Sequence, residues 1–265
     1  MANNSTIRRA GSATMGAEID AGLRAHMNKV YGLMAIGLAV TGLIAYIVGN
    51  DVTAVVDMLR VGLPSSAAQT TIIPASLIET MFVSPVRYVL IFSPIILAMV
   101  LQGMVNRISR STAQMMFYVM SALFGLSLSI VFAVYTSYSI TSTFLITSIA
   151  FTSLSLWGYT TKKDISGWGS FLMMGLVGLI LVMIVNIFLQ SEAVQFAFSA
   201  IGVLLFAALT AYDTQKIKTT YLQMANHPDG KTWLEKSAIM GALQLYLDFL
   251  NLFLFLLHFL GMARD

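Results

Sequence analysis

The sequence predicts an all-α membrane protein with seven transmembrane helices, and three observations support this fold class. Hydrophobic residues make up 57% of the 265 residues and charged residues only 10%, whereas soluble domains carry about 25% charged residues. A soluble domain of this length has too much surface in contact with water to bury so many apolar side chains. Seven apolar runs are long enough to cross a bilayer, and the connecting segments between them alternate between rich and poor in lysine and arginine.

The predicted spans are runs of about 20 mainly apolar residues, the length that an α-helix needs to cross the hydrocarbon core. The fourth run contains many serines and threonines and is the most polar. Met1–Leu23 has arginines but no adjoining apolar run, so it does not resemble a cleavable signal peptide, and the first span is expected to direct insertion. In chain order the spans are Val30–Val48, Tyr88–Val105, Met115–Val134, Ile140–Tyr159, Ser170–Leu189, Val194–Ala211 and Ala238–Leu260.

The positions of the 15 lysines and arginines predict the orientation of the chain. Cytoplasmic segments of membrane proteins are enriched in these residues. If the N-terminus is cytoplasmic, only three of them lie outside, at Arg60, Arg87 and Arg264. We therefore expect a cytoplasmic N-terminus and a C-terminus outside. The remaining 12 would lie inside, at Arg8, Arg9, Arg24, Lys29, Arg107, Arg110, Lys162, Lys163, Lys216, Lys218, Lys231 and Lys236.

Two segments are expected to lie outside the spans. Residues 1–23 are polar and predict a disordered N-terminal tail up to about Gly16, whereas residues 24–265 form the transmembrane domain; "AEIDAGLRAHMNKVYG" (17–32) predicts a helix that leads into the first span. Asn50–Pro85 is the one long loop, and its "AVVDMLRVGL" predicts short interfacial helices. The chain has no cysteine, which excludes disulfides and thiolate chemistry.

The last span contains an aspartate, Asp248, in the middle of an apolar run. Ionisable residues inside membranes cost about 2.5–3.5 kcal/mol at the helix centre and usually serve a function. At 100° per residue, Gln244, Asp248, Asn251, Phe255 and His258 fall within an arc of about 80°. Such a stripe predicts a face toward protein or water, and for Gln244 and Asn251 an interhelical hydrogen-bonded seam is the alternative. The opposite side carries Tyr246, Phe249, Leu250, Phe253 and Leu257 and is expected to face apolar neighbours.

A second aspartate, Asp213, lies at the cytoplasmic edge of the sixth span, within "LTAYDTQKIK". One interpretation is a carboxylate at the membrane edge that pairs with Lys216 or Lys218. The other is that Asp213 meets Asp248. Two adjacent carboxylates share a proton and titrate as a coupled pair, and they can also offer oxygen ligands to a transient Ca²⁺. Counted from the nearest lysines, however, Asp213 lies about one turn deep and Asp248 about three turns deep.

Four sequence segments carry a resemblance to a known family: "AYDTQKIK" (211–218), "LYLDFLNLFLFLL" (245–257), "YTTKKDISGWGSFL" (159–172) and "KSAIMGALQLYLDF" (236–249). They resemble the Bax inhibitor-1 family, also called the transmembrane Bax inhibitor motif proteins, and are most similar to its bacterial members. The resemblance therefore implies a place in a bacterial inner membrane. The resemblance covers about residues 24–261. It implies seven helices with the last one central and wrapped by the other six, and a pH-sensitive calcium leak channel. In that family two aspartates form a proton-sharing latch near the cytoplasmic side, and they match Asp213 and Asp248.

The chain departs from the family pattern at His258, where members often have an arginine that pairs with an acid on the second span. Here the second span holds no acid and has Ser93 and Pro94 in the corresponding region. His258 is either a group that titrates near neutral pH or a hydrogen-bonded residue near the helix end. The gating of the outer half of such a channel therefore cannot depend on the ion pair of the family pattern.

An enzyme, a protease modulator and a transporter are the alternatives to a channel. Intramembrane aspartyl proteases also have a Tyr-Asp pair, but their second aspartate lies beside glycine, unlike "LYLDFLN", and no zinc-protease or P-loop motif occurs. We therefore predict a non-enzyme without cofactors, with calcium and protons as its ions, the lipid bilayer as its surroundings and no nucleic-acid partner. The alternative is a non-catalytic modulator of an ATP-dependent membrane protease, and a small-solute transporter is disfavoured because no inverted repeat is visible.

Overall fold

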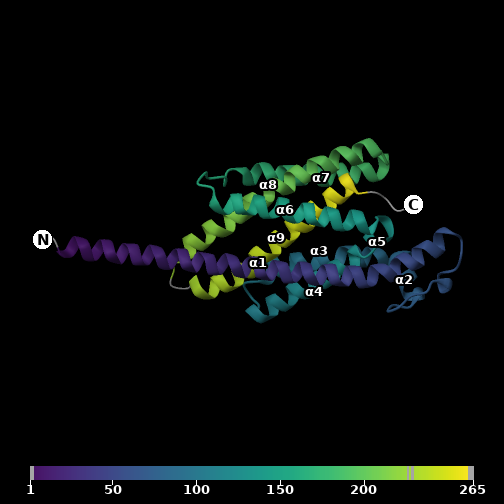
Figure 1. Ribbon diagram of the computed structural model, residues 1–265, viewed down its shortest axis with the longest axis horizontal. Helices are drawn as coiled ribbons and strands as arrows, with labels where there is room; N and C mark the ends of the chain where they lie inside the picture. Colours follow the sequence, from purple (N-terminus) through teal and green to yellow (C-terminus); the bar gives the residue numbers. More distant parts are fainter. Residues whose placement is uncertain (1–2, 226, 228–229, 262–265) are drawn as a thin grey trace.

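A computed structural model describes the backbone of residues 3–225, 227 and 230–261, and the side chains of residues 19–225, 227 and 233–261. Seven helices within these residues are long and apolar enough to cross a membrane, as predicted. Figure 1 shows them as one elongated bundle. The elements are α1 (Asn3–Arg60), η1 (Ser65–Ala67), α2 (Ala75–Phe82), α3 (Val86–Met104), α4 (Arg110–Leu128), α5 (Val131–Val134), α6 (Ser137–Thr160), α7 (Trp168–Leu189), α8 (Glu192–Met224) and α9 (Gly230–Leu260).

The fourth predicted span, despite its serines and threonines, forms the continuous helix α6. Several of its hydroxyl groups donate to backbone carbonyl oxygens one turn earlier in the same helix, so they need no partner outside it. Thr147 donates to Thr143 at 2.7 Å, and Thr141 donates to Ser137 at 2.9 Å. Hydroxyls satisfied inside their own helix are compatible with a membrane span.

The first span is longer than predicted, because α1 continues beyond the apolar run to Arg60. The "AVVDMLRVGL" segment therefore extends α1 rather than forming a separate interfacial helix, and only η1 and α2 occupy the rest of the expected loop. Asp51 explains how this loop is held, since its buried carboxylate accepts the backbone N–H groups of Thr71, Ile72 and Ile73 at 2.7, 2.8 and 2.9 Å. Charge-assisted hydrogen bonds of this kind fold the loop back onto α1.

The expected boundary between tail and transmembrane domain at Arg24 has no counterpart in the backbone, which is helical from Asn3. Leu23 is buried in the main core, and Gly22 lies against the hydroxyl of Tyr221. The packed part of the chain therefore begins before Arg24. Disorder of the residues before Ile19, whose side chains lie outside those described, stays a prediction.

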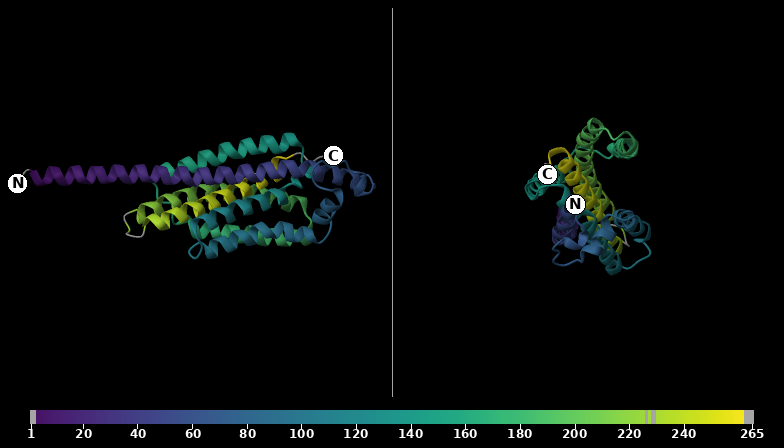
Figure 2. Two further views of the ribbon diagram at one scale, coloured as in Figure 1. Left: turned by 90° about the horizontal axis from the view of Figure 1, so that it is seen from below. Right: turned by 90° about the vertical axis from the view of Figure 1, so that its right-hand side faces the viewer.

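Helix α9 occupies the centre of the bundle, as the family resemblance implied. It has the largest buried share of the seven candidate spans. It runs obliquely between two groups of helices, with α6, α7 and α8 on one side and α1, α3 and α4 on the other (Figure 1 and Figure 2). It packs against α8, α1, α6 and α4, and α3 and α7 complete the surroundings across a cavity.

Several segments rich in basic residues lie together at one end of the bundle. Lys236, in the first part of α9, donates to the carbonyl oxygen of Asn106 in the α3–α4 connection at 3.4 Å. Arg110 forms an ion pair with Glu235 at 3.2 Å. Lys218 donates to the carbonyl oxygen of Tyr159 at the end of α6 at 2.6 Å. This gathering fits the predicted alternation of lysine and arginine, and the cytoplasmic location of this end stays a prediction.

Candidate functional site

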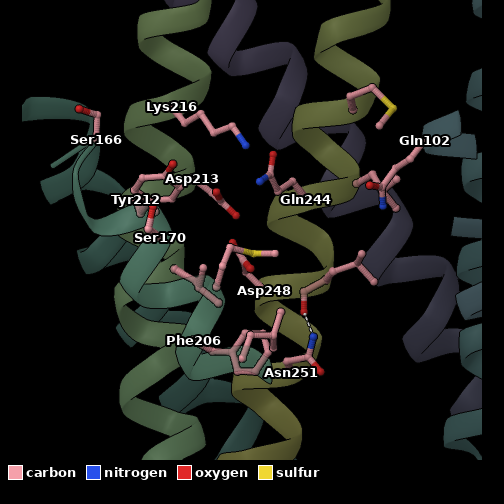
Figure 3. Close-up of a pocket in the computed structure, with 17 residues that line it drawn as sticks. Gln102, Ser166, Ser170, Phe206, Tyr212, Asp213, Lys216, Gln244, Asp248 and Asn251 are labelled. Carbon is pink, nitrogen blue, oxygen red and sulfur yellow. Dashed lines mark hydrogen bonds between the residues drawn. The ribbon is translucent and has the colours of Figure 1, made fainter. Parts of the chain in front are cut away.

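A cavity of about 810 Å³ lies beside α9 near the basic end of the bundle. Its wall is formed by α8 and α9, by the first half of α7 and by Gln102 of α3. Both predicted aspartates line it, and Figure 3 shows their side chains directed toward one another from α8 and α9. Asp213 is 4% exposed and Asp248 is 5% exposed, so both carboxyl groups are withdrawn from the surroundings.

The register of α8 against α9 explains why the two aspartates meet. Ile217 packs over Gly241, and Phe255 packs over Gly202. In an antiparallel pair, the same register places Asp213 opposite the segment between Gln244 and Asp248. The estimated difference in depth was wrong because it used lysines as depth markers. Helix α8 continues to Met224, well beyond Lys216 and Lys218, so these lysines do not mark its end.

The alternative of an ion pair between Asp213 and a neighbouring lysine is not formed. Lys218 points to the carbonyl oxygen of Tyr159. Lys216 lines the cavity and its charge acts on both aspartates, but in the described part of the chain no salt bridge joins it to either carboxylate. Oxygen Oδ2 of Asp248 is buried without a hydrogen-bond partner among the described residues. The two carboxyl groups are therefore close neighbours without a compensating cation in contact.

The predicted polar stripe of α9 divides into two parts. Gln244 and Asn251 lie in the cavity wall on either side of Asp248, and the amide of Asn251 donates to the carbonyl oxygen of Leu247 at 2.8 Å. His258 does not line the cavity. Its Nδ1 lies 2.7 Å from the carbonyl oxygen of Leu254 and its ring contacts Tyr135, which is the arrangement of a hydrogen-bonded residue near a helix end.

The opposite side of α9 is less uniformly apolar than expected. The Tyr246 hydroxyl lies 2.6 Å from the hydroxyl of Thr41, which donates to the carbonyl oxygen of Ser121 at 2.8 Å. Tyr246 is fully buried. This hydrogen-bonded contact fixes α9 to α1 and α4 behind the cavity, and periodicity alone could not show it because a tyrosine counts as apolar in such a pattern.

The α6–α7 connection is fastened to α8 next to Asp213. The Gln215 side chain accepts the N–H of Ile165 at 2.9 Å and donates to the carbonyl oxygen of Lys163 at 2.7 Å. Gly169 at the start of α7 lies against the Tyr212 hydroxyl. Periodicity along one helix gives no sign of these contacts, and the structure shows that the α6–α7 connection and α8 pack on one another to build one wall of the cavity.

The site offers few ligands for a resident metal. No group of three or more histidine, cysteine, aspartate or glutamate side chains that could hold a metal occurs within the described residues. Calcium takes six to eight oxygen ligands in typical sites. Two carboxylates with the amide oxygens of Gln244 and Asn251 could contribute only part of such a shell, and water would have to supply the rest.

Comparisons with known proteins identify relatives over nearly the whole chain. The family model described as "Inhibitor of apoptosis-promoting Bax1" matches residues 23–265. Inner membrane protein YbhL of Escherichia coli strain K12 is 41% identical over 245 residues, which cover 92% of this chain and 94% of YbhL. A Caulobacter vibrioides protein is 41% identical over 247 residues, covering 93% of this chain and 92% of its own length. A Rickettsia prowazekii protein is 40% identical over 246 residues, covering 93% of each chain.

These matches agree with the residues that first suggested the family, since all four quoted segments fall within the matched range. The seven candidate spans and the naming of YbhL together assign the chain to the inner membrane as an integral protein. The chain belongs to the Bax inhibitor-1 family.

Proposed function

We propose that this protein is a pH-sensitive calcium leak channel whose gate is the proton shared by Asp213 and Asp248. The observation that carries the proposal is the burial of both carboxyl groups in one cavity, where the described residues offer neither a salt bridge from a lysine nor a partner for one Asp248 oxygen. If these two residues only joined α8 to α9 by hydrogen bonds, amide side chains would do so equally well without a charge to neutralise.

The shared proton provides a switch between two states of the α8–α9 contact. Two carboxylates in contact cannot both ionise at low cost, so they retain one proton between them. When that proton is lost, two negative charges face one another and repel, which favours separation of α8 from α9. The freed carboxylates then attract Ca²⁺, which competes with the proton for the same oxygens. The leak is therefore expected to rise with pH and to fall on acidification.

The pathway is closed on the His258 side of the cavity by aromatic rings. Phe255 follows Asn251 along the stripe of α9, and its ring stacks on Phe206 at 5.6 Å between centroids. Phe198 meets the same ring edge-on at 5.7 Å. Apolar constrictions of this kind exclude hydrated ions. Phe255 thus takes the place of the ion pair that the family pattern would put in this half of the protein.

The test of the proposal is calcium flux into proteoliposomes across about pH 5–8, a range that covers the expected titration of a coupled carboxyl pair. Wild type should leak more as pH rises, whereas Asp213→Asn and Asp248→Asn should each lose most of this dependence. Protein-free liposomes supply the baseline. Absence of flux from wild type, or a wild-type pH profile in both variants, would sink the proposal. The protease-modulator alternative requires neither aspartate, so these variants also separate the two functions.

Replacing Phe255 with alanine should raise the leak severalfold at every pH, because it opens the apolar constriction without touching the aspartates. The pH dependence should persist, since Asp213 and Asp248 are unchanged. Phe188→Ala removes an equally large ring from α7, where Phe188 is 83% exposed, and should leave the leak unaltered. A Phe255→Ala variant that elutes as a folded protein but leaks no more than wild type would place the pathway elsewhere.

A further inference from the structure

A second cavity, of about 270 Å³, adjoins the aspartate cavity at the basic end of the bundle. It lies where α8 approaches its end and α9 begins, and α1 and the α3–α4 connection close its other sides. Lys216, Met240 and Gln244 line both cavities. The proposed channel function gives no role to this space.

The lining of the second cavity is cationic. Lys216 of α8 and Lys236 of α9 contribute their ammonium groups to it, His26 of α1 adds an imidazole ring, and none of the described residues that line it is acidic. The nearby carboxylate of Glu235 is engaged by Arg110 at 3.2 Å. On the side of the aspartate cavity, the charged groups that face Lys216 are Asp213 and Asp248.

The two lysines of this cavity have hydrogen-bond donors that are not used elsewhere, and the other polar side chains of its wall add further donors. Among the described residues, the Lys216 ammonium makes no hydrogen bond or ion pair, although it is close enough for its charge to act on the aspartates. Lys236 has only a long contact, 3.4 Å, to the carbonyl oxygen of Asn106. His26 contacts the Tyr221 ring and has no hydrogen-bond partner in the described structure. Thr220 and Trp233 add a hydroxyl and an indole N–H to the wall.

We propose that this cavity binds a phosphate-bearing anion between Lys216 and Lys236. Lysine ammonium groups are common phosphate ligands, and two of them without acidic neighbours in the wall form a site that favours an anion over a cation. The volume lies slightly below the range of drug-sized pockets, about 300–1,000 Å³, which suits a phosphate or a lipid headgroup better than a nucleotide.

Two sources could supply the phosphate, and the surroundings fit both. Trp233 is 38% exposed at the start of α9, a position typical of aromatic residues at the membrane–water interface. Basic pockets between helices at the cytoplasmic surface hold anionic lipid headgroups in other membrane proteins. A free phosphate group would use the same lysines. In either case the anion would sit one side chain away from Asp213, because Lys216 lines both cavities.

The experiment compares wild type with Lys216→Gln, Lys236→Gln and the control Lys162→Gln. Lys162 is exposed in the α6–α7 connection and does not line the cavity, so its substitution removes the same charge elsewhere. Inorganic phosphate binding is measured by calorimetry on protein in a neutral detergent. Retention of lipid is measured by native mass spectrometry after reconstitution in vesicles that contain phosphatidylglycerol and phosphatidylcholine.

We expect Lys216→Gln and Lys236→Gln each to weaken anion binding by about fivefold or more, since a lysine near a phosphate contributes about 1 kcal/mol. Lys162→Gln should bind as wild type does. An effect on inorganic phosphate identifies a free anion site, and an effect on phosphatidylglycerol alone identifies a headgroup site. Binding that is absent, or equal in all four proteins with matching melting temperatures, would overturn the inference. Because binding is measured without flux, this result is independent of the proposed channel function.

Discussion

Replacing Gly158 with leucine is expected to separate α6 from α8 and to prevent the bundle from folding. A Cβ atom on Gly158 would lie 2.3 Å from the carbonyl oxygen of Ala211 and 3.0 Å from its Cα. These are backbone atoms of a buried helix, so they cannot rotate away as a flexible side chain could. Small residues allow membrane helices to approach this closely, and the close packing itself holds them together.

The cost should exceed the 1–3 kcal/mol typical of an overpacked core, because backbone rather than side chain is displaced. Ala211 is two residues from Asp213, so any protein that survives should also have a distorted aspartate cavity. The measurement is the yield of monodisperse protein and its melting temperature in detergent. Gly178→Leu is the matched control, since a Cβ on Gly178 of α7 meets nothing within 4 Å. Equal behaviour of the two variants would contradict the close contact.

The transmembrane architecture could be predicted from the sequence because each span satisfies its own backbone hydrogen bonds and needs only a long apolar run. All seven spans were found this way. The third shows the limit of the method, since Met115–Val134 is interrupted between the end of α4 at Leu128 and the start of α5 at Val131. An apolar run carries no signal for such a break, which depends on how neighbouring helices pack.

The residues of the site were also found from the sequence, but of their contacts only the meeting of Asp213 and Asp248 was expected, and only from the family resemblance. A charge within an apolar run identifies Asp248 without any knowledge of the fold. The meeting with Asp213 depends on the register set by Gly202 and Gly241, which periodicity along one helix cannot reveal. Asp51 was missed for a similar reason, because its partners lie 20–22 residues further along the chain in what the sequence presents as an ordinary loop.

The double variant Asp213→Asn/Asp248→Asn should change the calcium leak no more than either single variant does. A proton can be shared only while both carboxyl groups are present, so the first substitution already abolishes the switch. Residues that act as a unit give non-additive effects, and groups in contact typically show coupling energies of about 0.5–3 kcal/mol. The measurement is the ratio of flux at the two ends of the pH range for wild type, both single variants and the double variant.

Independent action of the two aspartates would give a different result, because the logarithms of the two single effects would then add in the double variant. Asp164 supplies the control for this comparison. It is exposed in the α6–α7 connection, near the same end of the bundle, and its carboxylate accepts the N–H of Ser166 at 2.9 Å. Asp164→Asn removes an equal charge outside the cavity, so combining it with Asp248→Asn should give the effect of Asp248→Asn alone. Additive effects for Asp213 and Asp248 would mean that each carboxylate acts separately, and the shared proton could not be the gate.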